Sequence, residues 1–439
     1  MFKKMMDALR IKDIRHRLFF VLLCLVIIRV GSQIPVPGVN RSYFAQWFAS
    51  QTGDAFNFFD AFTGGSFSSM SILALSITPY ITSSIIIQLL TIAIPALEEM
   101  QRDGEDGRKK LTTITRFVTV GLALFESIAM AVGFGNNGLI PDMDFAKAVI
   151  VVVSLTAGSA FLMWIGEQIT EYGVGNGISI VLLINILSRV PQDLTSLYEQ
   201  FIKTRSNAAW GVLAGLVILA IILLMIVMVI ILDGAQRHIP VQYAKKMAGR
   251  RMMGGQSSHI PLKINTAGVI PVIFASSIMS FPGIIASFVG KSNPGGVWGT
   301  ILGTLSSNNW FSLKRPVYNI GLLIYIVLVI FFAYFYTSIT FNPLEVADNL
   351  KKAGGMIPGI RPGKPTSEYL NRILNYIIFI GACGLVIIAI IPFFFNGVFG
   401  ASVSFGGTSI IIIVGVILET IKKIESMMMV RNYKGFLSE

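Results

Sequence analysis

The sequence predicts an all-α membrane protein with ten transmembrane helices in two five-helix halves. Two observations support this fold class. Hydrophobic residues make up 54% of the 439-residue chain and charged residues only 13%, whereas about a quarter of an ordinary soluble domain is charged. The chain also repeats apolar runs of roughly 20 residues, the length that crosses a bilayer, and polar or basic segments separate them.

Ten apolar runs are candidates for the spans. In chain order they are Leu18–Ile34, Ile72–Leu97, Phe117–Phe134, Ala146–Ile165, Ile178–Val190, Trp210–Leu232, Ala267–Val289, Val317–Ile339, Ile373–Phe395 and Ser404–Ile421. Nine of them have about the length of a spanning helix. The fifth is shorter, and hydropathy alone would allow it to be re-entrant.

The distribution of Lys and Arg orients the spans. The chain carries 35 Lys and Arg against 23 Asp and Glu, and basic residues of membrane proteins collect on cytoplasmic loops. With a cytoplasmic N-terminus and ten spans, most of the basic residues fall on the inside. Without the fifth span the basic region 236–263 would lie outside, so the charges favour a full crossing there. Both termini are then expected in the cytoplasm.

The chain divides between the fifth and sixth spans. We expect an N-terminal half, residues 1–205, and a C-terminal half, residues 206–439. Each half has an odd number of spans, so the halves must lie in opposite orientation, which permits an inverted repeat. The second half contains two inside loops, 233–263 and 342–372, and loops of this length are usually functional.

The segment Phe56–Ser71 differs from every other part of the chain. It is rich in Phe but only half a span long, and Gly64-Gly65 interrupts it just before the second span. Broken backbone at membrane depth is tolerated where it is buried in protein or lines a water-filled cavity. The segment therefore predicts a pathway through the protein with a movable element in it.

The motifs do not indicate an enzyme. The run Gly173–Gly177 lacks the spacing of a dinucleotide fingerprint and predicts a tight turn that opens a helix, with Asn176 or Gly177 near its cap. The Gly-Lys-Ser at 290–292 lacks the first glycine of a phosphate-binding loop, because that position is Ile285. The spans contain no paired catalytic groups of an intramembrane protease. We expect no catalytic residue, no cofactor and no metal.

Two functions remain open on these residues, a polypeptide channel and an inverted-repeat secondary transporter of a small solute. Ion-coupled transporters usually carry acidic or histidine relays at the midplane of the membrane. Glu126 is a lone candidate for such a relay, and a neighbouring helix more often satisfies a residue of this kind. The missing relay and the two large basic loops favour the channel.

Basic residues at the tips of the two inside loops are candidates for partner docking. The turn Gly359–Gly363 presents an arginine, a residue suited to carboxylate or phosphate contacts, on backbone that proline and glycine define. The alternative is ordinary positive-inside charge. The candidate residues are Lys245, Lys246, Arg250, Arg251, Arg361 and Lys364.

Many segments along essentially the whole chain match one family in the right order. They are Pro35–Gly38, Phe62–Gly65, Pro79–Ile81, Gly166–Glu171, Gly175–Ser179, Gln256–Lys263, Ala267–Pro271, Asn342–Pro343, Ala347–Leu350, Gly359–Gly363 and Gly406–Ser409. In these segments the chain resembles the SecY family, the channel subunits of the bacterial Sec protein translocase.

The resemblance implies an hourglass pore between two halves that open like a clamshell. Its waist would be a ring of aliphatic side chains, and the segment 58–71 would be a plug that closes the outer funnel. The implied ring is Ile77, Ile81, Ile178, Leu182, Ile273 and Ile412, and the implied plug residues are Phe58, Phe62, Gly64, Gly65 and Phe67. A lateral gate would lie between the second and third spans on one side and the seventh and eighth on the other.

The resemblance also implies partners and a location. The channel would translocate unfolded secretory polypeptides and release membrane-protein helices sideways into lipid. Its partners would be the small membrane subunits SecE and SecG, the SecA ATPase motor, the ribosome, signal peptides, nascent polypeptides and membrane lipids. Arg361 matches a family position important for docking the motor or the ribosome. The expected location is the bacterial plasma membrane.

Overall fold

The structure is a computed structural model of the chain. It describes residues 9–50, 60, 62–135, 140, 144–203, 208–243, 247–248, 251–252, 257–288, 296–306, 309–311, 316–399 and 407–435. The implied plug residue Phe58 and the candidate docking residues Lys245, Lys246 and Arg250 lie outside these residues.

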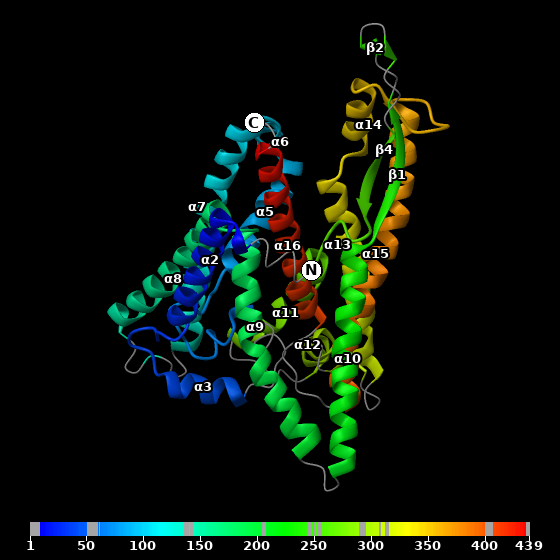
Figure 1. Cartoon of the computed structure of the whole chain (residues 1–439). Helices are drawn as coiled ribbons and strands as arrows, with labels where there is room; N and C mark the ends of the chain where they lie inside the picture. Colours follow the sequence, from blue (N-terminus) through cyan, green and yellow to red (C-terminus); the bar gives the residue numbers. More distant parts are fainter. Residues whose placement is uncertain are drawn as a thin grey trace.

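The N-terminal half is built from helices that follow the predicted spans, with the additional helix α3 between the first two spans (Figure 1). These helices are α2 (Lys12–Gly31), α3 (Arg41–Ser50), α5 (Thr78–Ala93), α6 (Pro95–Arg102), α7 (Gly104–Phe134), α8 (Phe145–Tyr172) and α9 (Gly177–Leu197), which continues as the π-helix η2 (Tyr198–Lys203).

The C-terminal half combines helices with short strands. Its helices are α10 (Ala208–Gly234), α11 (Ile270–Phe288), α12 (Val297–Leu305), the 3-10 helix η4 (Pro316–Asn319), α13 (Ile320–Thr340), α14 (Pro343–Lys352), α15 (Lys364–Phe399) and α16 (Gly407–Gly435). Its strands are β1 (Gln236–Tyr243), β2 (Met247–Ala248), β3 (Arg251–Met252), β4 (Ser257–Lys263) and β5 (Gly355–Met356).

Each predicted span overlaps a helix of the structure. Within the described residues, six helices are long and apolar enough to cross a membrane, and the bent pair α5–α6 makes a seventh if it counts as one span. The short fifth run belongs to one of the six, because the helical stretch Gly177–Lys203 is 27 residues long. Polar residues beyond Val190 extend that helix, which is why hydropathy underestimated its length. The count of ten spans stays a prediction.

The second predicted span has a different beginning and end from those expected. Residues 72–77 form turns, and the helix begins at Thr78 with Pro79 in its first turn, a position where proline needs no hydrogen-bond donor. The helix stops at Ile94, which is extended with ψ 110°, because a residue before a proline, here Pro95, is disfavoured in α geometry. The pair α5–α6 is bent by 108° at this break.

The two large inside loops fold together. In the described residues, strands of both loops form one antiparallel sheet in the order β4-β1-β5, which extends beyond the end of α10 (Figure 1). Ile239 of β1 lies opposite Ile260 of β4, and Gln242 lies opposite Met356 of β5. Apolar side chains of the sheet pack in one cluster with residues of α14 and α15. The loops 233–263 and 342–372 therefore form a single unit.

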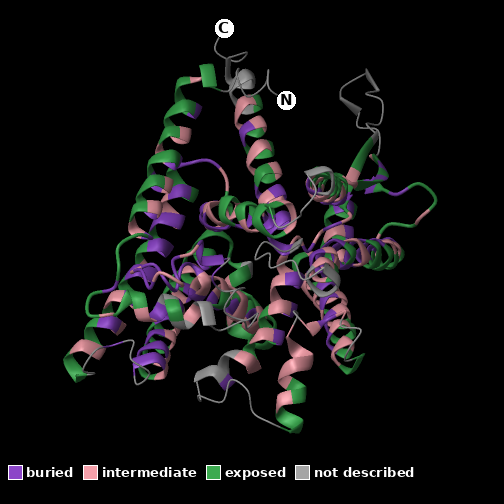
Figure 2. Ribbon diagram, turned by 90° about the horizontal axis from the view of Figure 1, so that it is seen from below, coloured by how far each residue is buried: buried purple, intermediate pink, exposed green. Residues whose placement is uncertain are grey.

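Residues that are buried lie mainly where the helices face one another, and exposed residues cover much of the outward faces (Figure 2). On α10 the exposed side chains are apolar and include Leu213, Leu216 and Leu223. A soluble protein rarely exposes a contiguous apolar surface of this kind, whereas a helix in lipid needs one. The outward face of α10 is therefore the face expected to meet the bilayer.

Candidate functional site

The six side chains implied for the waist belong to one hydrophobic cluster. They come from the start of α5, from α9, from α11 and from α16, which lie far apart in the sequence. Ile77, Leu182 and Ile412 are buried members of this cluster, with Ile77 fully enclosed. Ile81, Ile178 and Ile273 are partly buried and pack against it. The fold thus brings together all six residues of the predicted ring.

Local sequence fixes the first turn of α9, whose apolar residues belong to this cluster. Asn176 caps α9, because its side-chain oxygen accepts the backbone N–H of Ile178 at 3.1 Å, which confirms the predicted cap. Thr170 of α8 accepts the N–H of Gly177 at 2.9 Å. Both bonds fix the entry of the helix that carries Ile178 and Leu182.

The segment before α5 is a compact run of turns. Gly64 and Gly65 have φ of 66° and 82°, left-handed values that glycine adopts without strain. The N–H of Val36 bonds to the carbonyl of Met70 at 3.0 Å, and the N–H of Ile72 bonds to the carbonyl of Ile34 at 2.9 Å. The end of the implied plug is thereby tied to the loop after α2.

Of the implied plug residues, the two phenylalanines that the structure describes pack in different places. Phe62 is buried in the same cluster as the six ring residues. Phe67 is buried in a second cluster, where it meets Phe44 of α3 with ring centroids 5.6 Å apart. The segment therefore lies between the central cluster and the helix α3.

Polar contacts that the sequence did not identify hold the same segment. Asp60 forms an ion pair with Arg189 of α9, and its Oδ1 accepts the N–H of Ser68 at 2.8 Å. The carbonyl of Gly64 accepts Ser188 Oγ at 3.3 Å and the guanidinium of Arg29 at 3.4 Å. Two features of the sequence could have indicated these contacts. They are the acidic residue Asp60 within a run of Phe and Arg29 inside the first span.

The implied docking residues that are described lie on the joined loops. Arg361 is exposed between Gly359 and Gly363, which have φ of 80° and 101°. Its carbonyl accepts Thr366 Oγ1 at 2.8 Å, so the turn is tied to the start of α15, where Lys364 is exposed. Of Arg251 only the backbone position, in β3, is described.

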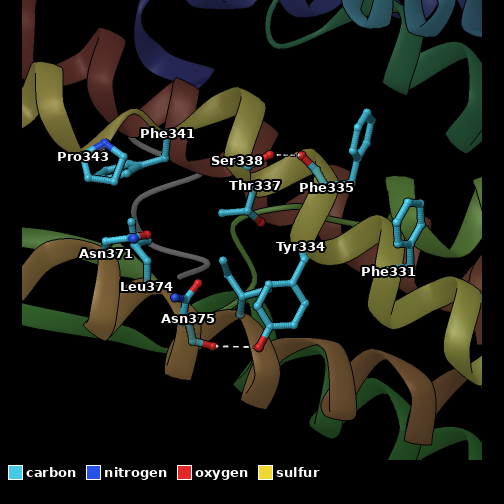
Figure 3. Close-up of a pocket in the computed structure, with 11 residues that line it drawn as sticks. Phe331, Tyr334, Phe335, Thr337, Ser338, Phe341, Pro343, Asn371, Leu374 and Asn375 are labelled. Atoms are coloured by element: carbon cyan, nitrogen blue, oxygen red, sulfur yellow. Dashed lines mark hydrogen bonds between the residues drawn. The ribbon is translucent and has the colours of Figure 1, made fainter. Parts of the chain in front are cut away.

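A pocket of about 400 Å³ opens between α13 and α15 (Figure 3). Tyr334 donates its hydroxyl to the carbonyl of Asn375 at 3.1 Å, and Ser338 donates to the carbonyl of Phe335 at 2.7 Å. The residues that line this pocket include no implied ring, plug or docking residue. The pocket is thus separate from the central cluster.

Known proteins match the chain over most of its length. The SecY family model matches residues 71–421. The chain belongs to the SecY family. The protein translocase subunit SecY of Halalkalibacterium halodurans is 44% identical over 443 residues, with 100% of both chains covered.

Solved structures show the same fold. A protein-conducting channel is similar with a TM-score of 0.67 and 17% identity, covering 94% of this chain and 92% of that one. Sec61 in the canine ribosome-channel complex from the endoplasmic reticulum is similar with a TM-score of 0.64 and 17% identity, at the same coverage. At these sequence identities the similarity shows the fold alone.

Membership of this family decides between the two functions that the sequence left open. The protein is a multi-pass membrane protein and a protein-conducting channel. The secondary-transporter alternative is not supported. The family is one of translocation channels and is not known as an enzyme family.

Proposed function

We propose that unfolded polypeptides cross the membrane between the six ring residues. The observation that carries this proposal is their convergence from α5, α9, α11 and α16 into one apolar cluster. Aliphatic side chains suit such a waist because they offer a moving chain no hydrogen bonds. A hydrophobic constriction also blocks ions by dewetting. Because the ring residues are packed in one cluster, the waist in this arrangement corresponds to a closed channel.

The plug in this proposal is the segment 58–71. Support comes from the position of Phe62 in the central cluster and from the turn conformation at Gly64 and Gly65. A segment built from turns rather than from a long helix can leave without unfolding a helix. Opening then requires this segment to leave the central cluster and the ring residues to part.

The ten predicted spans form two inverted halves in this proposal, residues 1–205 and 206–439, around an hourglass pore. The lateral gate lies between α5 and α7 on one side and α11 and α13 on the other. Direct contact between α7 and α11 supports this assignment. Signal sequences and membrane-protein helices would leave sideways through this contact into lipid.

The joined inside loops are the proposed docking unit for the driver of translocation. The exposed arginine in the turn at 359–363 and the sheet that links both loops support this role. The similar Sec61 structure comes from a ribosome-channel complex, and basic loops suit ribosomal RNA, whose binding is largely electrostatic. The other proposed partners are SecA, SecE and SecG, in the plasma membrane of a bacterium with both termini cytoplasmic.

Ion conductance of the resting channel tests the ring. The variant carries serine at Ile81, Ile178 and Ile273, the partly buried members whose replacement disturbs packing least. We expect a raised resting conductance in planar bilayers, because hydroxyl groups let water wet the constriction. A serine at the outward-facing Ile230 is the control and leaves the conductance unchanged. An unchanged conductance in the ring variant would refute the seal.

A further inference from the structure

One face of α9 carries a polar strip against the plug segment. Asn185, Ser188 and Arg189 have the spacing i, i+3 and i+4, which places them side by side on a helix. Each bonds to the segment between α3 and α5. Their partners are the Ser76 hydroxyl at 2.9 Å, the Gly64 carbonyl at 3.3 Å and the Asp60 carboxylate.

The ion pair of this strip is withdrawn from water. The side chain of Asp60 is 0% exposed and that of Arg189 is 12% exposed. Taking two charges out of water costs free energy that their attraction offsets only in part, so such a pair adds little net stability. Removing one partner is costly, because the other charge remains buried and uncompensated. A pair of this kind fixes a position rather than contributing stability.

The packing around Gly64 has the same effect. A Cβ at this position would lie 2.6 Å from the Asn185 carbonyl oxygen and 2.7 Å from Ser188 Oγ. The plug backbone therefore rests directly on the polar strip. Outward movement of the plug separates Ser188 from the Gly64 carbonyl and Arg189 from the Asp60 carboxylate together, whereas Ser76, the partner of Asn185, lies beyond the segment 58–71.

We propose that Ser188 and Arg189, on the face of α9 that also carries Asn185, form a latch that holds the plug closed, with the Asp60–Arg189 ion pair as its positioning element. This inference rests on the proposed role of the segment 58–71 as a plug. The latch makes release of the plug cooperative, since its bonds break together when the segment leaves. Substrates that open the channel have to supply the cost of breaking these bonds and separating the ion pair, less the free energy gained when the charges are rehydrated.

The test measures how often the plug leaves the resting channel. A reporter thiol replaces Ser66, a plug residue that is 2% exposed, after both native cysteines have been changed to alanine. The full chain, in membranes with its partner subunits and without substrate, is treated with a membrane-impermeant maleimide from the outer face. The variants are D60N, R189Q, D60N/R189Q and the conservative R189K.

The latch predicts a non-additive pattern. D60N and R189Q each raise the labelling rate by roughly tenfold or more, because each removes one charge of the buried pair and keeps the other. The double variant D60N/R189Q returns toward the parent rate, since a neutral pair can hydrogen-bond and leaves no buried charge. R189K lies between the parent and R189Q, because it keeps the charge but loses the planar fork.

A matched control separates the latch from a general loss of stability. Arg116→Gln removes another ion pair, Arg116–Glu167 between α7 and α8, and should leave labelling at the parent rate. Equal labelling in the parent, both single variants and the double variant would overturn the latch, as would additive effects in the double variant. The comparison of variants is made without substrate. Failure of the proposed plug role shows separately, in a second arm with a secretory polypeptide added, as labelling of the parent that the polypeptide does not speed.

Discussion

The glycine at position 64 provides the sharpest test of how the plug is seated. Gly64 and Gly65 both have left-handed φ, 66° and 82°, so alanine at either position carries a backbone cost of about 1–2 kcal/mol. Their surroundings differ. A Cβ at Gly64 would lie within 2.9 Å of three atoms of Asn185 and Ser188, whereas at Gly65 the nearest atom is 3.8 Å away, on Arg189.

The two alanine variants therefore isolate the steric contribution. Overpacking a filled site costs about 1–3 kcal/mol, so Gly64→Ala should destabilise the seated plug by about 2–5 kcal/mol and Gly65→Ala by about 1–2 kcal/mol. The difference of about 1–3 kcal/mol corresponds to a roughly 5–150-fold larger open population for Gly64→Ala. Gly65→Ala serves as the matched control for backbone strain.

Single-channel recording in planar bilayers, without substrate, measures the open population directly. We expect both variants to open more often than the parent and Gly64→Ala to open far more often than Gly65→Ala. Equal opening of the two variants would refute the seating of Gly64 on α9. Parent-like closure of Gly64→Ala would refute it as well.

Two further predictions concern the docking unit and the core. Arg361→Glu should reduce driver-dependent export roughly tenfold, because it replaces the charge-assisted bonds of an exposed arginine by repulsion. Arg361→Lys should have a milder effect, and the amount of channel in the membrane should be unchanged in both variants. Normal export in the glutamate variant would refute the docking role. Trp310→Ala should cost about 3–5 kcal/mol, because Trp310 is 1% exposed, donates to the Thr304 carbonyl at 2.9 Å and packs on Phe393. Thermal unfolding in detergent checks this loss, with the exposed Trp298→Ala as a control that leaves the transition unmoved.

The sequence alone predicted the helical architecture because long apolar runs have few alternatives in a bilayer. It underestimated the helix at 177–203, whose second half is polar. It also began the second span at Ile72, because residues 72–77 are apolar although their backbone forms turns. Hydropathy reports where a chain is apolar and says little about backbone conformation.

The candidate site was predicted unevenly. The six ring residues followed from the family resemblance, and their spacing alone would also fit ordinary helix packing. The contacts of Asp60 with Arg189 could not be predicted, because the two residues are 129 positions apart and no periodicity connects them. The union of the two inside loops in one sheet was missed for the same reason, since pairing between distant strands leaves no local pattern.

Crosslinking of a translocating chain tests the central claim most directly. Photoreactive side chains replace Ile77, Ile81 and Ile412 in turn, and a secretory polypeptide is stalled during export. Leu216, on the outward face of α10, is the control position. We predict crosslinks from the three ring positions and none from Leu216. Absence of ring crosslinks while the stalled chain spans the membrane would show that polypeptides do not pass through this cluster.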